Sequence, residues 1–215
     1  LNTCRDIFRP LLQHLISKFQ DTGSTIGIVF NGSTCFTGES GSGESKIREW
    51  LVQKDLIECI VRLPNELFFN TPLTTYIWIL RNRKTVDRKG KIQLIDGSDC
   101  FQVLKKPLGD KNKVITKQQR KYLLDLYLSN SLSENSRFID PLELGYKTIQ
   151  IETPLNTDSR KPKPDKEKRV IQRIPIDIDD QEYFEENRDK FGSDSWLDKS
   201  KTKVGYEIIF NRYFH

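Results

Sequence analysis

The sequence predicts an α/β fold, in which the chain supplies the second half of an α/β sheet that finishes in an antiparallel hairpin. A helical pattern, an apolar run, a second helical pattern and a second apolar run follow one another between residues 7 and 61, as in α/β proteins. Two more apolar runs, at 73–80 and 91–96, follow without a helical pattern between them. We therefore expect the last strands to pair directly with each other.

The first predicted helix spans residues 7–19, where apolar side chains recur at helical spacing. Pro10 is expected in its first turn, where a missing N–H leaves no hydrogen bond unmade. Residues 25–30 (TIGIVF) are then predicted to form a buried strand, and a long polar, glycine-rich loop is expected over 31–44.

A second, short helix is predicted around Ile47 and Leu51, and either Ser42 or Ser45 can cap its first turn. Three strands are predicted at the apolar runs that follow, which are 56–61, 73–80 and 91–96.

The character of the sequence changes after residue 105. Thr116 and Gln119 form a capping-box pattern, which predicts a helix through about Leu128. Residues 129–145 are predicted to be linker, and 146–151 a short strand. We divide the chain into the C-terminal half of an α/β domain at 1–105, a helical segment at 106–130, and a linker with a C-terminal arm at 131–215.

Composition indicates a folded and modestly basic protein. Of 215 residues, 36% are hydrophobic and 30% are charged, and the formal net charge is +5. No apolar run reaches the roughly 18 residues that a membrane helix needs, and no basic-then-apolar leader opens the chain. We expect a cytoplasmic protein without a membrane partner. The first residue, Leu1, and the absence of Met predict a piece of a longer protein.

Neither the cysteines nor the glycine-rich loop predicts a metal or nucleotide site. The cysteines lie tens of residues apart without a Cys-x-x-Cys pair, so we expect reduced thiols and no metal. Residues 38–45 match the spacing of a phosphate-binding loop, except that Glu44 stands where the lysine belongs. Together with Glu39 it would repel phosphate, and a flexible connection is the better interpretation.

Two oppositely charged runs lie in the last third of the chain. Residues 160–173 hold seven basic side chains, and residues 177–189 hold seven acidic ones. The basic run can follow a phosphate backbone, but such a run is more often a solvated linker. The acidic run would weaken a nucleic-acid contact or form an intramolecular charge pair with it. Both interpretations stay open.

The candidate site is the loop between the apolar runs 56–61 and 73–80. It carries two aromatic rings, Phe68 and Phe69, followed by the amide of Asn70. Such a loop suits a flat ligand with polar edges, for example a nucleobase. Packing of the rings on the protein's own core is the competing interpretation, and spacing alone favours it.

Three stretches of the chain resemble the modification (methyltransferase) subunit of type I restriction–modification systems. They are FNGSTCFTGESGSGESKIREWLVQKDLIECIVRLPNELFFNTPLTTYIWILRNRK, KGKIQLIDGS and KTKVGYEIIFNRYF. The resemblance covers about residues 7–105, 140–155 and 177–215. Proteins of that family transfer a methyl group from S-adenosylmethionine to the exocyclic amine (N6) of adenine in DNA.

The resemblance implies the C-terminal half of a Rossmann-like S-adenosylmethionine-dependent methyltransferase sheet, ending in an antiparallel hairpin, plus a mixed helical and irregular C-terminal arm. By position, Phe68 and Phe69 would stack on an adenine flipped out of the duplex, and Asn70 would reach its edge. Asn31 and Ser33 would lie in a loop on the substrate side. The implied partners are DNA, the specificity subunit and the restriction (motor/nuclease) subunit.

Two motifs of that family do not occur in this sequence: the glycine-rich cofactor loop after a first strand, and Asn-Pro-Pro-Phe/Tyr. In the family both lie upstream of the matched region. We therefore expect a C-terminal portion of the subunit that has no catalytic or cofactor-binding residue and is inactive alone, although the family implies S-adenosylmethionine. The alternative is a non-catalytic, methyltransferase-like module that serves assembly.

Overall fold

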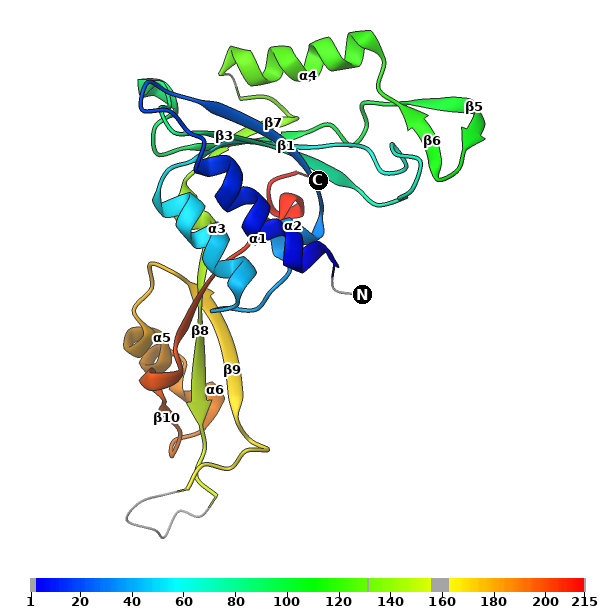
Figure 1. The fold of residues 1–215 in the computed structure, drawn as a ribbon. Coiled ribbons are helices and arrows are strands. Elements are labelled where there is room, and N and C mark those ends of the chain that lie inside the picture. Colours follow the sequence, from blue (N-terminus) through cyan, green and yellow to red (C-terminus); the bar gives the residue numbers. More distant parts are fainter. Residues whose placement is uncertain (1–2, 131, 156–162, 215) are drawn as a thin grey trace.

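A computed structural model describes residues 3–130, 132–155 and 163–214, and its centre is a five-stranded mixed sheet (Figure 1). The strand order is β1-β3-β2-β4-β7. The strands are β1 (Thr25–Asn31), β2 (Ile57–Arg62), β3 (Thr75–Arg81), β4 (Ile92–Asp96) and β7 (Ser136–Ile139). Helices α1 (Thr3–Ile16) and α3 (Gly43–Gln53) lie on one face, and α4 (Lys117–Ser129) lies on the other (Figure 1).

The direction of the strands places three carboxyl ends at one edge of this sheet. β3 is antiparallel to both β1 and β2, while β2 is parallel to β4. β1, β2 and β4 therefore run the same way and end together, at Asn31, Arg62 and Asp96. The α/β class and the β2–β3 hairpin are confirmed. The hairpin is not the last element of the sheet, because β4 and β7 continue it.

A second sheet is built around β8 (Gly145–Glu152). Its other strands are β9 (Val170–Pro175), β10 (Trp196–Leu197) and β11 (Lys203–Tyr206), all antiparallel to β8. Two short helices, α5 (Asp180–Glu186) and α6 (Arg188–Phe191), pack on one face of this sheet. The small core between them contains Ile149, Ile151, Ile174 and Phe184.

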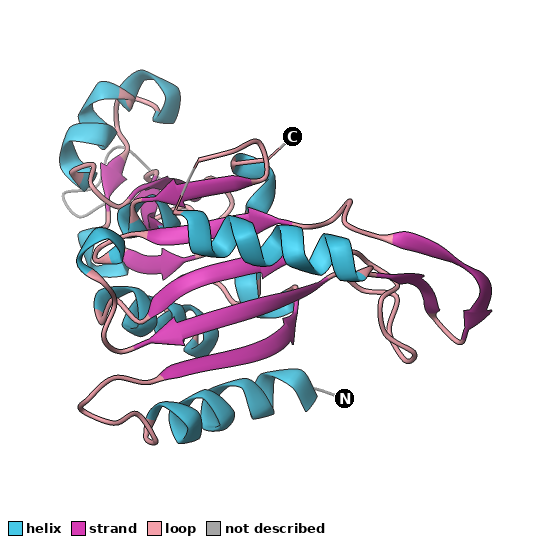
Figure 2. Ribbon diagram, turned by 90° about the horizontal axis from the view of Figure 1, so that it is seen from above, coloured by secondary structure: helices cyan, strands magenta, loops and turns pink. Residues whose placement is uncertain are grey.

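A third, two-stranded sheet is formed by β5 (Gln102–Leu108) and β6 (Lys111–Val114). We call this pair the ribbon. Seen from above the main sheet, it projects away from the body of the protein, beyond the end of α4 (Figure 2). Its side chains are mostly exposed or half-buried.

The last residues of the chain return from the second sheet to the core of the first. Tyr206, Ile208, Phe210 and Phe214 are buried there. Arg48, fully buried on α3, donates hydrogen bonds to the carbonyls of Tyr206 (2.6 Å), Thr34 (3.0 Å) and Thr37 (2.8 Å). A guanidinium has five donors and can satisfy several carbonyls at once, so this residue ties the tail to the first sheet.

The predicted caps and most predicted strands are confirmed. Ser42 is the N-cap of α3 and accepts a hydrogen bond from the Ser45 amide (3.3 Å). Thr116 and Gln119 form the capping box of α4. β2, β3, β4 and β8 lie where apolar runs predicted them. No helix among residues 3–130, 132–155 and 163–214 is long and apolar enough to span a membrane.

Several local predictions are wrong. The first helix begins at Thr3, so Pro10 lies in its interior rather than in its first turn. β1 is an edge strand instead of a buried one, and its Val29 side chain is 50% exposed. The loop at 31–44 contains a short helix, α2 (Ser33–Phe36).

The stretch predicted to be linker, 129–145, is also structured. It forms β7, which pairs with β4, and a 3-10 turn at Pro141–Leu144. The sequence did not predict β7, because this strand is only four residues long and contains Ser136 and Arg137 instead of a continuous apolar run. The division of the chain into domains stays a prediction.

Candidate functional site

The carboxyl edge of the first sheet carries a half-buried charge pair. Arg62 donates from Nε to Asp96 Oδ1 (2.8 Å) and from Nη2 to Oδ2, which is a bidentate arrangement. Burial alone would raise the pKa of Asp96, but the hydrogen bonds from Arg62 and Ser98 outweigh burial and hold this pKa below its usual value. Ligands of open α/β sheets bind at this edge.

A polar pocket of about 520 Å³ opens beside this pair. Its lining includes Arg62, Asn65, Tyr76, Asp99, Lys113 and Asn211. The C-terminal tail closes one side, because Asn211 accepts a hydrogen bond from Arg62 (2.9 Å) and the Phe210 ring lies 5.1 Å from the Tyr76 ring. Burial raises the pKa of Tyr76 to about 12, so its hydroxyl stays protonated at neutral pH.

Most of this pocket was missed by sequence reasoning. Arg62 and Asp96 are the last residues of β2 and β4. Both strands were predicted from the sequence, so the position of these two residues at one edge of the sheet could have been predicted as well. Asn211 carried no such signal, since only the folded path of the tail brings it to the pocket.

The loop at 63–74 is compact and anchored at its base. The Leu63 amide donates to the Thr75 carbonyl (2.9 Å), and the Glu66 amide donates to the Pro72 carbonyl (3.1 Å). Leu67 packs against the small core beneath α4. Leu63 is buried in the same core, so these two leucines, rather than either phenylalanine, attach the loop to the interior.

The two predicted rings are on the surface. The Phe68 side chain is 36% exposed and the Phe69 side chain is 61% exposed, and Asn70 is exposed as well. The spacing favoured packing of these rings on the protein's own core. The structure instead exposes both rings. Their role in binding a base stays a prediction.

The ribbon lies directly against this loop. The Asp110 amide donates to the Phe69 carbonyl (3.1 Å), and the Asn112 amide donates to the Glu66 carbonyl (3.0 Å). Lys111 Nζ lies 5.0 Å from the centroid of the Phe69 ring, within the range of a cation–π contact. Sequence reasoning missed this neighbour because it predicted no strand in this lysine-rich segment.

Asn31 and Ser33 lie at the same edge of the sheet, at the end of β1. Asn31 is opposite Thr75, the first residue of β3, and therefore close to the point where the 63–74 loop returns to the sheet. The Ser33 hydroxyl donates to Asn31 Oδ1 (2.5 Å). The structure thus brings these two predicted residues together, and their contact with a substrate stays a prediction.

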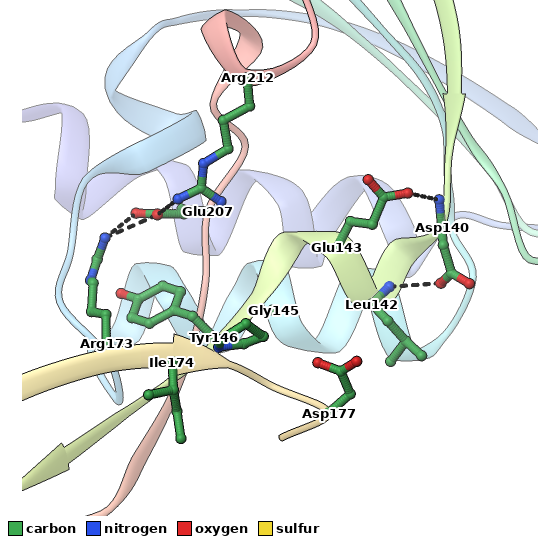
Figure 3. Close-up of a pocket in the computed structure, with 11 residues that line it drawn as sticks. Asp140, Leu142, Glu143, Gly145, Tyr146, Arg173, Ile174, Asp177, Glu207 and Arg212 are labelled. Atoms are coloured by element: carbon green, nitrogen blue, oxygen red, sulfur yellow. Dashed lines mark hydrogen bonds and ion pairs between the residues drawn. The ribbon is translucent and has the colours of Figure 1, made fainter. Parts of the chain in front are cut away.

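A second pocket, of about 620 Å³, lies where the second sheet meets the tail (Figure 3). Glu207 accepts hydrogen bonds from Arg173 (2.9 and 3.0 Å) and from Arg212 (3.0 Å). The Arg173 guanidinium also lies 3.9 Å from the centroid of the Tyr146 ring. Because both arginines of this pocket are paired with Glu207, we interpret it as a structural junction.

Three of the four cysteines are described as buried thiols. Cys35, Cys59 and Cys100 are free thiols. Burial raises the pKa of Cys35 to about 12, which makes it an inert thiol at neutral pH. Within the described ranges, no group of His, Cys, Asp and Glu is placed to hold a metal ion.

Comparison with known proteins identifies the family. The model of the N-6 DNA Methylase family matches residues 5–145, which include the first sheet, the ribbon and the 63–74 loop. The type I restriction enzyme MjaVII methylase subunit of Methanocaldococcus jannaschii is 42% identical over 77 residues, 36% of this chain and 13% of that protein. The HindI methylase subunit of Haemophilus influenzae is 38% identical over 86 residues, 40% of this chain and 18% of that protein.

A solved structure supports the same fold. The type I restriction–modification system methyltransferase subunit from Streptococcus thermophilus superposes with a TM-score of 0.54 at 23% identity, over 64% of this chain and 27% of that one. The chain thus spans less than a fifth of the length of the two relatives above. On the match over residues 5–145, it belongs to the N-6 DNA Methylase family.

Proposed function

We propose that this chain is part of a type I restriction–modification methyltransferase that methylates adenine N6 in DNA with S-adenosylmethionine. The family match across residues 5–145 carries the proposal. Relatives described as type I methylase subunits support it. We further propose DNA, the specificity subunit and the restriction subunit as partners.

We propose that the described residues do not hold S-adenosylmethionine on their own. Their glycine-rich turn, 38–43, is engaged elsewhere: the Gly41 amide donates to the Val204 carbonyl (2.9 Å) and Ser42 caps α3. At the carboxyl edge, Arg62 and Asp96 are already paired with each other. We therefore assign this chain no cofactor contact and derive no chemical step through the cofactor.

The contribution of this chain is on the substrate side. Adenine N6 lies inside the base stack, so the base must leave the duplex at a cost of ~2–3 kcal/mol or more. A stacked aromatic side chain returns roughly 1–3 kcal/mol per base. Phe68 and Phe69 are exposed on a loop held at both ends, where their rings can accept a base, and Lys111 lies 5.0 Å from the centroid of the Phe69 ring.

Asn70 is exposed next to these rings and offers both a donor and an acceptor to a base edge. Asn31 and Ser33 line the neighbouring end of β1 and extend the same substrate side.

The function is tested with the full-length subunit assembled with its specificity subunit. Duplex DNA is incubated with S-adenosylmethionine, digested to nucleosides and analysed by mass spectrometry. We expect N6-methyladenine to accumulate, and to be absent when the specificity subunit is withheld. A complex that assembles on DNA without producing N6-methyladenine would favour the non-catalytic assembly module instead.

A further inference from the structure

The ribbon carries a concentrated positive charge. Residues 102–114 contain four lysines and a single acidic residue, Asp110. The lysines are Lys105, Lys106, Lys111 and Lys113. Lys105 and Lys106 are exposed, and the other two are half-buried. Four positive charges less one negative charge leave this short segment at +3, more than half of the net charge of the chain.

No ion pair between described residues neutralises this charge. Among the described residues, the lysines that form ion pairs within 4.0 Å lie outside the ribbon. Lys113 donates to Asn65 and lies 4.2 Å from the centroid of the Phe101 ring. Lys111 lies over the Phe69 ring. Amides and aromatic rings orient these ammonium groups without cancelling their charge.

The ribbon also buries few of its own apolar side chains. Val103 is 64% exposed and Leu108 is 52% exposed. A two-stranded hairpin is marginal in water unless something packs against it. The contacts with the 63–74 loop supply part of that support, and a partner that binds the exposed side would supply more.

A glycine at the ribbon's turn allows the close contact with the candidate loop. Gly109 has a φ of +61°, and a Cβ there would lie 2.7 Å from the Phe69 carbonyl oxygen. Only glycine avoids both the strain and the clash. The glycine therefore lets the turn of the ribbon lie against the backbone of Phe69, with Lys111 over the Phe69 ring.

We propose that the ribbon binds the phosphate backbone of duplex DNA next to the flipped base, with its four lysines as phosphate contacts. Duplex DNA carries one negative charge per about 1.7 Å of its axis. Two exposed and two half-buried lysines on one short hairpin are complementary to that charge. Phosphate contacts fix the register of a protein on DNA without reading sequence. This inference rests on the proposed function, because it takes DNA as the substrate.

The test measures DNA affinity against salt concentration, without S-adenosylmethionine, using the full-length complex and a fluorescently labelled duplex that lacks its recognition sequence. The variant is Lys105→Gln with Lys106→Gln, two exposed positions. The control is Lys190→Gln with Lys199→Gln, two exposed lysines of the second sheet's helical side that change the net charge equally.

The ribbon variant should bind more weakly, and the slope of log affinity against log salt should become shallower by about 2, or about 1 per lysine. The control should keep the native slope. Gly109→Ala should also weaken binding, because it separates the ribbon from the loop. An unchanged slope in the ribbon variant, or an equal change in the control, would overturn the proposal.

Two other outcomes are informative. If the ribbon variant binds DNA normally but no longer assembles with the specificity subunit, the ribbon is a protein interface and the proposal is wrong. Failure of the proposed function would give a different result from failure of this inference. In that case the native complex would produce no N6-methyladenine, whatever the slope of affinity against salt.

Discussion

The two larger sheets of this protein differ in how many of their faces are covered. In the first sheet, helices cover both faces, and β2 is buried from Ile57 to Val61 without alternation. In the second, Ile149 and Ile151 of β8 face the core under α5, while Thr148 and Gln150 between them are only half-buried. Within the described part of the chain, helices thus cover both faces of the first sheet but only one face of the second.

The strongest test of this difference is a matched truncation of isoleucines. Ile60→Ala in β2 should lower the free energy of unfolding by about 2–5 kcal/mol, because Ile60 is fully buried. Ile171→Ala in β9 should change it by less than about 0.5 kcal/mol, because that side chain is 64% exposed. Urea denaturation monitored by circular dichroism measures both. Equal losses would mean that the open face is covered.

The same difference in burial explains which strands could be predicted from the sequence. β2 and β4, which are buried on both faces, are mostly apolar apart from the buried Glu58 and Gln93, and both strands were predicted. The ribbon was missed because it is lysine-rich and exposed, and β7 because it is short and polar. The pocket at the sheet edge needs Asn211, which lies 149 residues after Arg62, and no local pattern reports such a contact. The exposed phenylalanines were found because their residue types are unusual in a loop.

The charge pairs of the two sheets should also differ in how much they contribute to the free energy of unfolding. Asp96→Asn should cost about 1.5–3 kcal/mol at neutral pH, because it removes a charged partner of largely buried Arg62. Arg173→Gln in the second sheet should cost no more than about 1 kcal/mol, since its side chain is 52% exposed and Arg212 still pairs with Glu207.

The pH dependence of the Asp96 effect has a definite sign. The folded-state pKa of Asp96 is below its unfolded value of about 3.9. Its contribution to stability is therefore complete above that unfolded value and is lost as the pH falls through the lower folded value. The stability difference between the native protein and Asp96→Asn should shrink on acidification below about pH 4. Urea denaturation at several pH values measures it, and a difference that grows in acid would contradict the assignment.

A smaller effect is expected where the two regions join. Gly205→Ala places a Cβ 2.3 Å from the Tyr146 ring, so the second sheet must shift, at a cost of about 1–3 kcal/mol. Gly27→Ala in β1 is the matched control, because a Cβ there meets nothing within 4 Å. Thermal unfolding should show a lower Tm for Gly205→Ala alone. The same Tm in both variants would contradict the packing of Tyr146 on β11.

The most direct test of the central claim is whether the exposed rings contact the flipped base. The full-length complex is titrated with a duplex that carries the fluorescent base 2-aminopurine at the target adenine. Phe68→Ala and Phe69→Ala should each change the fluorescence of the bound duplex and weaken binding by about 5- to 150-fold, as the loss of roughly 1–3 kcal/mol of stacking requires. Tyr122→Ala, an exposed ring on α4, should leave both unchanged. If the two phenylalanine variants behave like Tyr122→Ala, the loop does not hold the base.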